Sequence, residues 1–405
     1  MASQPQGTGN ADDREQERHV SHQDIRRRTI AHMRAKTTDL AAASMPIDPA
    51  AYTDPERFEA ERRELFRKRP ILAGLTGDIP NAGDKLLFDV LGPPILLIRN
   101  KAGEVNAFLN MCPHRAARLV TECNSLSRMT CRFHGWTFDL DGRLIGLPGK
   151  EGFADMERDK IGLLPVPVVE WHGMIFVRAD PGGDPIDIED WLGDMAAELR
   201  HLELEKAVPA KSGTLHTDAN WKYAFDTYGE SYHFATLHPT TIGSLAFSNT
   251  MTHRPHGLHT RLGFPRADFA AYANLPEEDW PHSDYGGLYM IFPNTVINVN
   301  GMQGGGPFYG VSRVFPGDEP GKSVTLMTHY RPGHADPEMP MSAWEATHDF
   351  IHAVVRDEDY SVSAEGQRNL GWAPPGFRMR FGANEAVLQK QHRQIAEILD
   401  AANEG

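Results

Sequence analysis

Short runs in which apolar and polar residues alternate dominate the chain between residues 85 and 178. Alternation with a period of two is typical of strands that bury one face, and Gly, Pro and Asn residues separate the runs. The dipeptide Asp141-Gly142, which stands between two such runs, predicts a tight hairpin. The pattern therefore predicts an all-β unit with strands at 85–90, 95–99, 105–110, 136–140, 143–145 and 174–178.

Apolar residues at helical spacing mark much of the remaining chain. Asp54 followed by Pro55 predicts the start of a helix at 55–68, because an aspartate caps free amides and proline fits the first helical position. In the second half, strands that precede a long helix favour an α+β domain in which a sheet grips a helix. Helices are predicted at 188–202, 220–237, 341–370 and 384–402, and strands at 288–300 and 323–330.

Length and local composition divide the 405 residues into three parts. Residues 1–45 are rich in charged and polar side chains and are predicted to form a disordered or partly helical arm. The Pro- and Gly-rich stretch 180–185 indicates a domain boundary. Residues 46–180 then hold the β unit with its preceding helix, and residues 181–405 hold the second domain.

Charge and cysteine content limit the kinds of binding partner and the cellular compartment that the chain suits. The net charge of −14 argues against a nucleic-acid partner. The chain has no apolar run long enough to span a membrane, and its polar N-terminus contains no secretory signal. Three cysteines, two of them within metal-binding motifs, leave no disulfide framework, which predicts a cytoplasmic protein. The third, Cys123, is predicted to be a buried thiol without a role.

Two cysteines and two histidines stand in paired motifs separated by fifteen residues. The first motif is Cys112-Pro-His114-Arg and the second is Cys131-Arg-Phe-His134-Gly-Trp, each on a loop next to a predicted strand. Two thiolates and two imidazoles are the ligands of a Rieske-type [2Fe–2S] cluster, which transfers single electrons. The same four ligands also suit a structural zinc ion.

A second group of candidate metal ligands lies further along the chain. Glu230 and His233 are three residues apart and share a face if they lie on a helix. His233 and His238 are five apart, so both reach one metal only if the helix ends between them, and Pro239 favours such an end. Two histidines and a carboxylate form the site of non-haem Fe(II) oxygenases. The alternative is a pair of core or surface histidines without a metal.

The carboxylate ligand is predicted to come from the long helix near the C-terminus. Asp359 falls on the inward-facing stripe formed by His352, Val355 and Val362. Asp357 lies off that stripe and is the second candidate. A solvated acidic face is the alternative without a metal.

In their order and residues, these motifs resemble the catalytic (alpha) subunit of Rieske non-haem iron oxygenases, the aromatic-ring-hydroxylating oxygenase family. The Asn-Trp-Lys string that precedes Glu230 and the Glu-Asp-Tyr string around Asp359 add to the resemblance, which runs from Pro55 to the C-terminus. Ala116 and Asn369 stand where this family usually or often has Gly. Glu230 stands where most members have Asp, although carnitine- and choline-type oxygenases also have Glu.

The resemblance implies an all-β Rieske [2Fe–2S] domain followed by a helix-grip (START/Bet v1-like) catalytic domain with an antiparallel sheet. It implies a homotrimer in which an electron passes from His134 through Glu230 to His233 of the adjacent subunit. Because the chain has no Gly-rich dinucleotide fingerprint, NAD(P)H electrons are expected through a separate reductase, with or without a ferredoxin. The implied cluster ligands are Cys112, His114, Cys131 and His134, and the implied ligands of a mononuclear Fe(II) are His233, His238 and Asp359.

The predicted function is that of a terminal oxygenase that uses O₂ to hydroxylate an aromatic or alicyclic small molecule. Glu230 favours, as a second candidate, oxidative demethylation or a quaternary-amine substrate. A Rieske electron carrier without catalysis is the alternative from another class, and it would need no second iron. The run 252–261, rich in His and Arg, is a candidate for binding a substrate carboxylate or is a solvated strand. Several apolar residues indicate either an apolar substrate pocket or ordinary core packing: Tyr223, Phe225, Tyr228, Phe234, Leu237 and 288–292.

Overall fold

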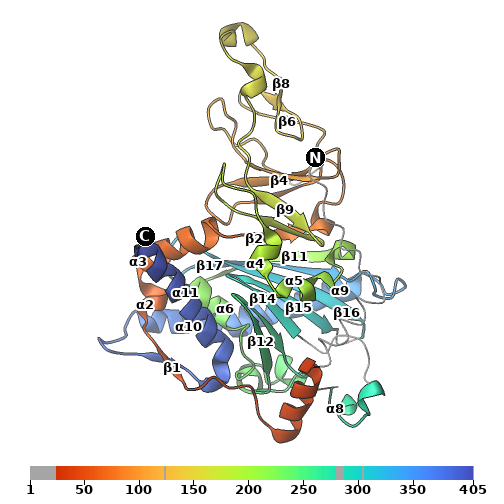
Figure 1. Ribbon diagram of the computed structural model, residues 1–405, viewed down its shortest axis with the longest axis vertical. Helices are drawn as coiled ribbons and strands as arrows, with labels where there is room; N and C mark the ends of the chain where they lie inside the picture. Colours follow the sequence, from red (N-terminus) through yellow and green to blue (C-terminus); the bar gives the residue numbers. More distant parts are fainter. Residues whose placement is uncertain (1–23, 123–124, 268, 280–286, 303–304, 405) are drawn as a thin grey trace.

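The computed structural model in Figure 1 is an elongated molecule with two stacked parts. It describes residues 24–122, 125–267, 269–279, 287–302 and 305–404. Short strands build the upper part, and a broad sheet with helices on it builds the lower part. Cys123 and the first 23 residues of the predicted arm lie outside the described residues.

The upper part contains three small antiparallel sheets, each of which holds at least one strand that the alternating pattern predicts. The hairpin at Asp141-Gly142 is present, and Gly142 has a φ of +79°, a value that favours glycine. The three sheets have the orders β3-β4-β5, β6-β7-β8 and β2-β10-β9. Their strands are β2 (Ile71–Leu75), β3 (Lys85–Phe88), β4 (Ile95–Arg99), β5 (Val105–Leu109), β6 (Met129–Thr130), β7 (Thr137–Phe138), β8 (Leu144–Gly146), β9 (Val168–Trp171) and β10 (Met174–Val177).

The lower part is built on one seven-stranded antiparallel sheet with the order β11-β17-β16-β15-β14-β13-β12. The predicted α+β class with an antiparallel sheet is therefore confirmed. The single strand predicted at 288–300 is instead a hairpin of two strands, β14 and β15. The strands are β11 (Val208–Thr217), β12 (Thr252–His256), β13 (His259–Gly263), β14 (Gly287–Ile291), β15 (Thr295–Gly301), β16 (Pro307–Pro316) and β17 (Ser323–Arg331).

Different elements cover the two faces of this sheet. Helix α9 (Ser342–Val354) contacts β11 and β17 on one face. It runs through a π-helical turn, η8 (Val355–Asp359), into α10 (Tyr360–Leu370), so the helix predicted at 341–370 is present but interrupted. On the other face, α4 (Ile188–Leu192) and α5 (Met195–Arg200) share a buried apolar cluster with the sheet and with strands of the upper part. The sheet thus separates α9 from the upper part.

Helix α3 (Pro55–Glu61) is anchored in the lower part by a buried ion pair. Asp54 caps this helix as predicted, since its side chain accepts from the amide of Glu56 at 2.8 Å. At the helix end the carboxylate of Glu61 accepts from Lys222 Nζ and, at 2.9 Å, from Trp221 Nε1. Glu61 and Lys222 are both fully buried. Burial lowers the pKa of Lys222, and the charge of Glu61 opposes that shift.

The remaining elements frame the lower part. Residues 24–35 of the predicted arm form a helix whose Ile30 is buried against Phe269 and Ala273. The C-terminal helix α11 (Ala386–Glu404) contacts α3 and β18. The other elements are β1 (Met45–Ile47), α2 (Ala50–Thr53), η1 (Arg62–Arg67), η2 (Thr76–Asp78), η3 (Lys150–Phe153), η4 (Arg158–Lys160), η5 (Leu204–Lys206), α6 (Trp221–Asp226), α7 (Phe234–Leu237), η6 (Ile242–Ser244), α8 (Phe269–Tyr272), η7 (Glu277–Asp279), β18 (Met379–Phe381) and η9 (Ala383–Glu385).

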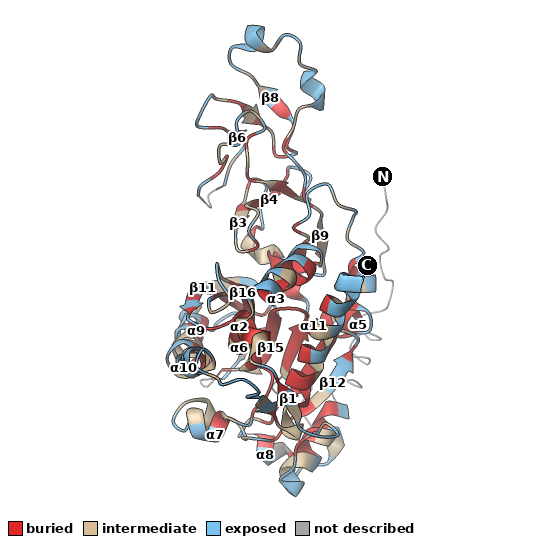
Figure 2. Ribbon diagram, turned by 90° about the vertical axis from the view of Figure 1, so that its left-hand side faces the viewer, coloured by how far each residue is buried: buried red, intermediate tan, exposed pale blue. Residues whose placement is uncertain are grey.

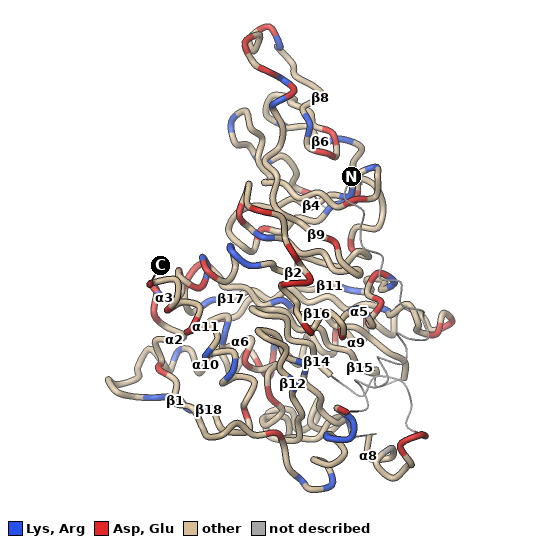
Figure 3. The backbone as a smooth tube through the Cα atoms, viewed as in Figure 1, with Lys and Arg blue, Asp and Glu red and all other residues tan. Residues whose placement is uncertain are grey.

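Charged side chains of both signs are spread over the described chain (Figure 3), and its basic residues are scattered among acidic ones. Within the described ranges, every helix is too short or too polar to cross a lipid bilayer.

Candidate active site

The two Cys/His loops of the upper part have the same backbone fold. In each loop the residue four positions after the cysteine donates its amide to the cysteine carbonyl at 2.9 Å, from Ala116 in the first and Gly135 in the second. In each loop the cysteine amide donates in turn to the carbonyl five positions later, at 2.8 Å. The histidine stands two residues after Cys112 but three residues after Cys131. One turn geometry therefore presents two imidazoles at different positions.

This shared geometry shows why glycine is favoured at the position that Ala116 occupies. The fourth residue after each cysteine has a left-handed backbone, with a φ of +57° at Ala116 and +74° at Gly135. Glycine adopts this conformation without strain, whereas a residue with a Cβ is strained by roughly 1–2 kcal/mol. Alanine therefore occupies a position whose backbone favours glycine, and the loop keeps its hydrogen bonds despite the strain.

The four side chains fit a Rieske cluster. Cys112 and Cys131 are buried, and the two imidazole centroids are 4.5 Å apart. The ring of His114 stacks on Trp136 at 4.9 Å, and its Nδ1 is buried without a hydrogen-bond partner among the described residues, as expected for an atom reserved for iron. His134 is exposed to solvent. The two cysteines are thus enclosed by protein, while the imidazole of His134 faces solvent.

His233 and His238 flank α7, a single helical turn. The prediction of one continuous helix at 220–237 is wrong in its middle. The segment forms two helices, α6 and α7, with irregular structure between them. His233 is the N-cap of α7 and His238 is its C-cap, directly before Pro239. The helix end that the five-residue spacing requires is therefore present, and the two ring centroids lie 5.1 Å apart.

Asp359 completes a three-residue group with these histidines. Its Oδ1 lies 3.4 Å from His233 Nε2 and 3.3 Å from His238 Nε2, and the three potential ligand atoms are all within 4.8 Å of one another. Asp359 ends the π turn η8, a kind of turn that recurs at functional sites. Asp357 is exposed and forms an ion pair with Arg356 at 2.6 Å, so the structure does not bring it to this group. Two imidazoles and one carboxylate suit a mononuclear iron.

Two further carboxylates orient the histidines. Glu230 accepts from His233 Nδ1 and from the amides of Tyr232 and His233, so it caps the turn that carries the ligand. Glu358 Oε2 lies 2.6 Å from His238 Nδ1 and accepts from Thr241 Oγ1 at 2.9 Å. Both Nε2 atoms are thereby directed toward Asp359, as outer partners of metal-binding histidines commonly do. Sequence reasoning missed Glu358, although its position beside Asp359 was an available signal.

The close approach of His233, His238 and Asp359 shifts the pKa values of these residues. Burial lowers the pKa of His233, but hydrogen bonds to Asp359 and Glu230 outweigh that effect and raise it to about 9. Burial raises the pKa of Asp359, but hydrogen bonds from His233 and His238 lower it overall. The site therefore concentrates negative charge around two imidazoles, an arrangement that favours a cation at its centre.

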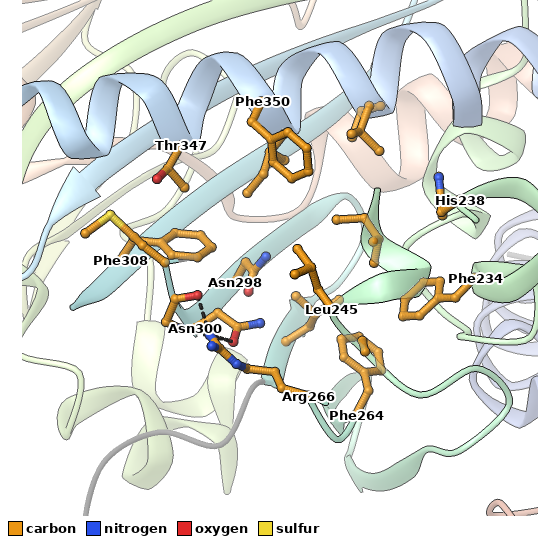
Figure 4. Close-up of a pocket in the computed structure, with 18 of the residues that line it drawn as sticks. Phe234, His238, Leu245, Phe264, Arg266, Asn298, Asn300, Phe308, Thr347 and Phe350 are labelled. Carbon is orange, nitrogen blue, oxygen red and sulfur yellow. Dashed lines mark hydrogen bonds between the residues drawn. The ribbon is translucent and has the colours of Figure 1, made fainter. Parts of the chain in front are cut away.

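A cavity of about 730 Å³ opens beside His233, His238 and Asp359, between α9 and the sheet. Figure 4 shows aromatic and aliphatic side chains over much of its wall, together with Arg266, Asn298 and Asn300. Three predicted apolar residues, Tyr228, Phe234 and Leu288, line it. Phe225, Met290 and Phe292 belong to the buried core instead. Further lining residues include Ile242, Leu245, Phe264, Met302, Phe308, Thr347, Phe350, Ile351 and Val354.

The run 252–261 does not line this cavity. It forms the hairpin of β12 and β13, in which Arg261 is buried and paired with Glu198. His259 is also buried: its Nδ1 accepts from the amide of Phe292 at 3.0 Å, and its Nε2 lies 2.8 Å from the carbonyl of Trp191. Burial lowers the pKa of His259 to about 4, and these residues therefore serve the packing of the sheet.

Family models match both parts of the chain. A model described as the Rieske [2Fe-2S] domain matches residues 70–163, and one described as the ring hydroxylating alpha subunit (catalytic domain) matches residues 204–401. The carnitine monooxygenase oxygenase subunit of Escherichia coli K12 is 31% identical over 358 residues, which are 86% of this chain and 92% of that protein. The glycine betaine monooxygenase oxygenase subunit of Pseudomonas aeruginosa is 34% identical over 203 residues, 50% of this chain and 47% of that protein.

Solved structures share the fold over nearly the whole chain. A quaternary ammonium Rieske monooxygenase in complex with L-carnitine has a TM-score of 0.72 at 23% identity, and the match covers 92% of this chain and 98% of that one. Naphthalene 1,2-dioxygenase from Rhodococcus sp. has a TM-score of 0.68 at 19% identity, with 93% and 98% covered. The chain therefore belongs to the Rieske oxygenases, as a catalytic (alpha) subunit that uses a [2Fe–2S] cluster and a mononuclear iron.

Proposed function

We propose that the three ligands at one end of the cavity hold the mononuclear iron and that the substrate is oxygenated in that cavity. The observation that carries this proposal is the convergence of His233, His238 and Asp359 beside a largely apolar cavity. When bound, the iron activates O₂ and the cluster supplies single electrons. The proposed cluster ligands are Cys112, His114, Cys131 and His134.

The chain's own residues contribute orientation and exclusion of water. Glu230 and Glu358 fix which ring nitrogen of each histidine points to the metal. The apolar wall limits the access of water to the reacting end of the substrate.

The arrangement of the two sites supports electron transfer between chains. Figure 2 places β6, next to the cluster loops, near the top of the molecule and α7, with the iron ligands, near the bottom. The exposed His134 and the iron site of one chain thus lie at opposite ends. We therefore propose that His134 of one subunit donates its electron to Glu230 and His233 of a neighbour, in a homotrimer. A separate reductase would reload the cluster, and the cytoplasmic location and the domain boundary at 180/181 stay predictions.

The cavity lining supports a largely apolar substrate. Aromatic and aliphatic side chains form most of its wall, and its volume of about 730 Å³ accommodates a fused-ring compound. An aromatic or alicyclic substrate therefore remains the first candidate. A quaternary amine is the second candidate, favoured by the 31% identity to a carnitine monooxygenase subunit and by the aromatic faces of Phe234 and Phe264, since such rings bind quaternary ammonium groups.

One experiment tests the function and separates the two substrate classes. The iron-loaded protein with a surrogate reductase is given NADH and O₂ and screened against aromatic, alicyclic and quaternary-amine compounds, with mass spectrometry of the products. Ring hydroxylation adds oxygen to the intact substrate, whereas oxidation at a quaternary amine releases an amine or formaldehyde. Substrate-independent oxygen consumption with every compound would contradict the proposed function.

Glu230→Gln tests the proposed electron bridge. The amide keeps the size of the side chain but removes its charge, so with Fe(II) in excess both metals should stay bound while substrate-dependent product formation falls at least tenfold, in the range seen for outer partners of metal ligands. Iron content and the EPR signal of the reduced cluster serve as controls in the same samples. Near-normal product formation in this variant would contradict the bridging role.

A further inference from the structure

Among the described residues that line the cavity, one polar side chain lacks a protein partner. The hydroxyl groups of Thr227 and Thr347 donate to main-chain carbonyls at 2.9 and 2.8 Å. Asn300 Oδ1 accepts from the amide of Gly301 at 3.0 Å. Asn298 lines the same cavity, but neither its Oδ1 nor its Nδ2 has a hydrogen-bond partner in the described part of the chain. The wall therefore contains an amide that is available to a ligand.

The position of Asn298 in the sheet accounts for its missing partner. Asn298 stands directly opposite Leu288 on β14 and Gly310 on β16, neither of which has a polar side chain. Its Oδ1 is buried among these neighbours. Asn300, two residues further along β15 and on the same face, is by contrast held by the backbone at the strand end. The sheet thus satisfies one of two neighbouring amides and leaves the other unpaired.

An unpaired amide in an apolar wall indicates a polar group on the ligand. Burying an amide without hydrogen bonds lowers the stability of the fold, so an apolar side chain of the same size would be more stable at this position. Figure 4 shows Asn298 between Phe308 and Leu245 in the view, apart from His238. Because no protein contact fixes its orientation, the amide can turn either its N–H groups or its oxygen toward a ligand.

We propose that Asn298 hydrogen-bonds a neutral oxygen, a carbonyl or a hydroxyl, on the ring system of the substrate and so sets which carbon atom faces the iron ligands. The inference deepens the proposed function, on which it rests for the place of the reaction. An uncharged amide suits a neutral oxygen, because it cannot offset the cost of burying an ion. The aromatic and aliphatic part of the wall then holds the rest of the ring system.

Three compounds with one fused-ring skeleton test this hydrogen bond. Tetralone carries a carbonyl, tetralol carries a hydroxyl and tetralin carries neither. In calorimetric titrations of the anaerobic holoenzyme, Asn298→Leu should weaken binding of tetralone, tetralol or both about 3- to 10-fold, the effect of one neutral hydrogen bond, and leave tetralin within about twofold. A loss for one oxygen compound alone identifies the oxygen that the amide binds. The matched control is Asn369→Leu, the same change at an exposed position of α10 outside the cavity lining, which should alter none of the affinities.

Equal losses for all three compounds, or failure of both oxygen compounds to bind the wild-type protein, would overturn the proposal. A spectroscopic signature separates direct contact from a structural role, since a hydrogen bond lowers the stretching frequency of a carbonyl or a hydroxyl group. The compound that responds to Asn298→Leu should therefore show this infrared band at lower frequency in the wild type than in the variant, and an unshifted band would contradict direct contact. Asn298→Ala serves if the leucine variant misfolds, and an unchanged preference between the oxygen compounds and tetralin would again overturn the proposal.

Product formation distinguishes this inference from the proposed function. If cyclic compounds are oxygenated while Asn298→Leu leaves the affinities for tetralone and tetralol unchanged, only the hydrogen bond to the substrate is overturned. If binding of an oxygen compound depends on Asn298 but no compound in the screen is oxygenated, the proposed function fails and the hydrogen bond stands.

Discussion

Three consecutive acidic residues, Asp357, Glu358 and Asp359, are expected to affect iron binding to three different degrees. Asp359 Oδ1 lies within 3.4 Å of both histidine Nε2 atoms, so Asp359→Asn removes a charged ligand. Glu358 contacts only His238 Nδ1, at 2.6 Å, and Thr241. Asp357 is exposed and paired with Arg356. Replacing each acid by its amide keeps the size of the side chain, so the comparison isolates charge and position.

The expected losses follow from these contacts. Glu358→Gln converts a charge-assisted hydrogen bond into a neutral one and should lower Fe(II) affinity 10- to 100-fold, or about 1.4–2.7 kcal/mol. Asp359→Asn should lower it by more than about 100-fold, because one of three protein ligands is lost. Asp357→Asn should leave the affinity within about twofold, since an exposed ion pair contributes little.

The assay is competition between each variant and an Fe(II) chelator under anaerobic conditions, with the EPR signal of the reduced cluster as an internal control for folding. A larger loss in Asp357→Asn than in Asp359→Asn would refute the assignment of the third ligand. Wild-type affinity in Glu358→Gln would refute the view that this carboxylate orients His238.

Buried charges and left-handed residues give three other expectations. Because the pKa of His259 is about 4 in the folded chain, against 6.5 ordinarily, the unfolded chain binds more protons between these values and stability falls as pH drops. His259 contributes about 2 kcal/mol of this loss from pH 7.5 to 5, so the loss should be smaller by that amount in His259→Gln, as urea midpoints at both pH values will show. An equal pH response in both proteins would contradict this expectation. Glu61→Leu should lower the free energy of unfolding in urea by about 3–5 kcal/mol, because it leaves the charge of Lys222 buried and unpaired. Adding Lys222→Met should restore most of that stability. A double variant as unstable as the single one would argue against the buried pair. Gly135→Ala should add roughly 1–2 kcal/mol of backbone strain and so lower the temperature at which the cluster absorbance is lost. Ala116→Gly should relieve strain and raise that temperature slightly. Opposite shifts would exclude the shared turn.

Local patterns in the sequence predicted the parts of the fold that short stretches of chain determine. The Asp54 cap, the hairpin at Asp141-Gly142 and the alternating strands near the cluster each depend on neighbouring residues. The helix break between His233 and His238 was likewise predictable, because five-residue spacing and a following proline are both local features. These elements therefore needed no knowledge of tertiary contacts.

The prediction of Asp359 as the third ligand rested on only partly correct reasoning. The stripe that pointed to Asp359 assumed a regular helix, yet Val362 on that stripe is 48% exposed. His352 lies against strand β11, where a Cβ at Gly213 would be 2.8 Å from its ring. The π turn changes the phase of the helix, and no feature of the local sequence required it. The resemblance to the family carried the assignment where periodicity did not.

Two other contacts between distant segments were not predicted. Glu358 meets His238 across 120 residues of chain, and Arg266 meets the end of β15 across 35. Such pairs depend on how the sheet brings its strands together, which a single sequence does not reveal. Glu230 and His233 are a mixed case: their contact was predicted, but a capped turn rather than a helix face provides it.

The π turn at 355–359 also has a consequence for how such a site arises. A π turn holds one residue more than an α-helical turn, and each residue rotates a helix by about 100°. Deleting a single residue there would return the segment to regular winding and swing Asp359 away from the histidines, while the helix itself could persist. The difference between a plain helix that covers a sheet and one that supplies a metal ligand is then a single inserted codon.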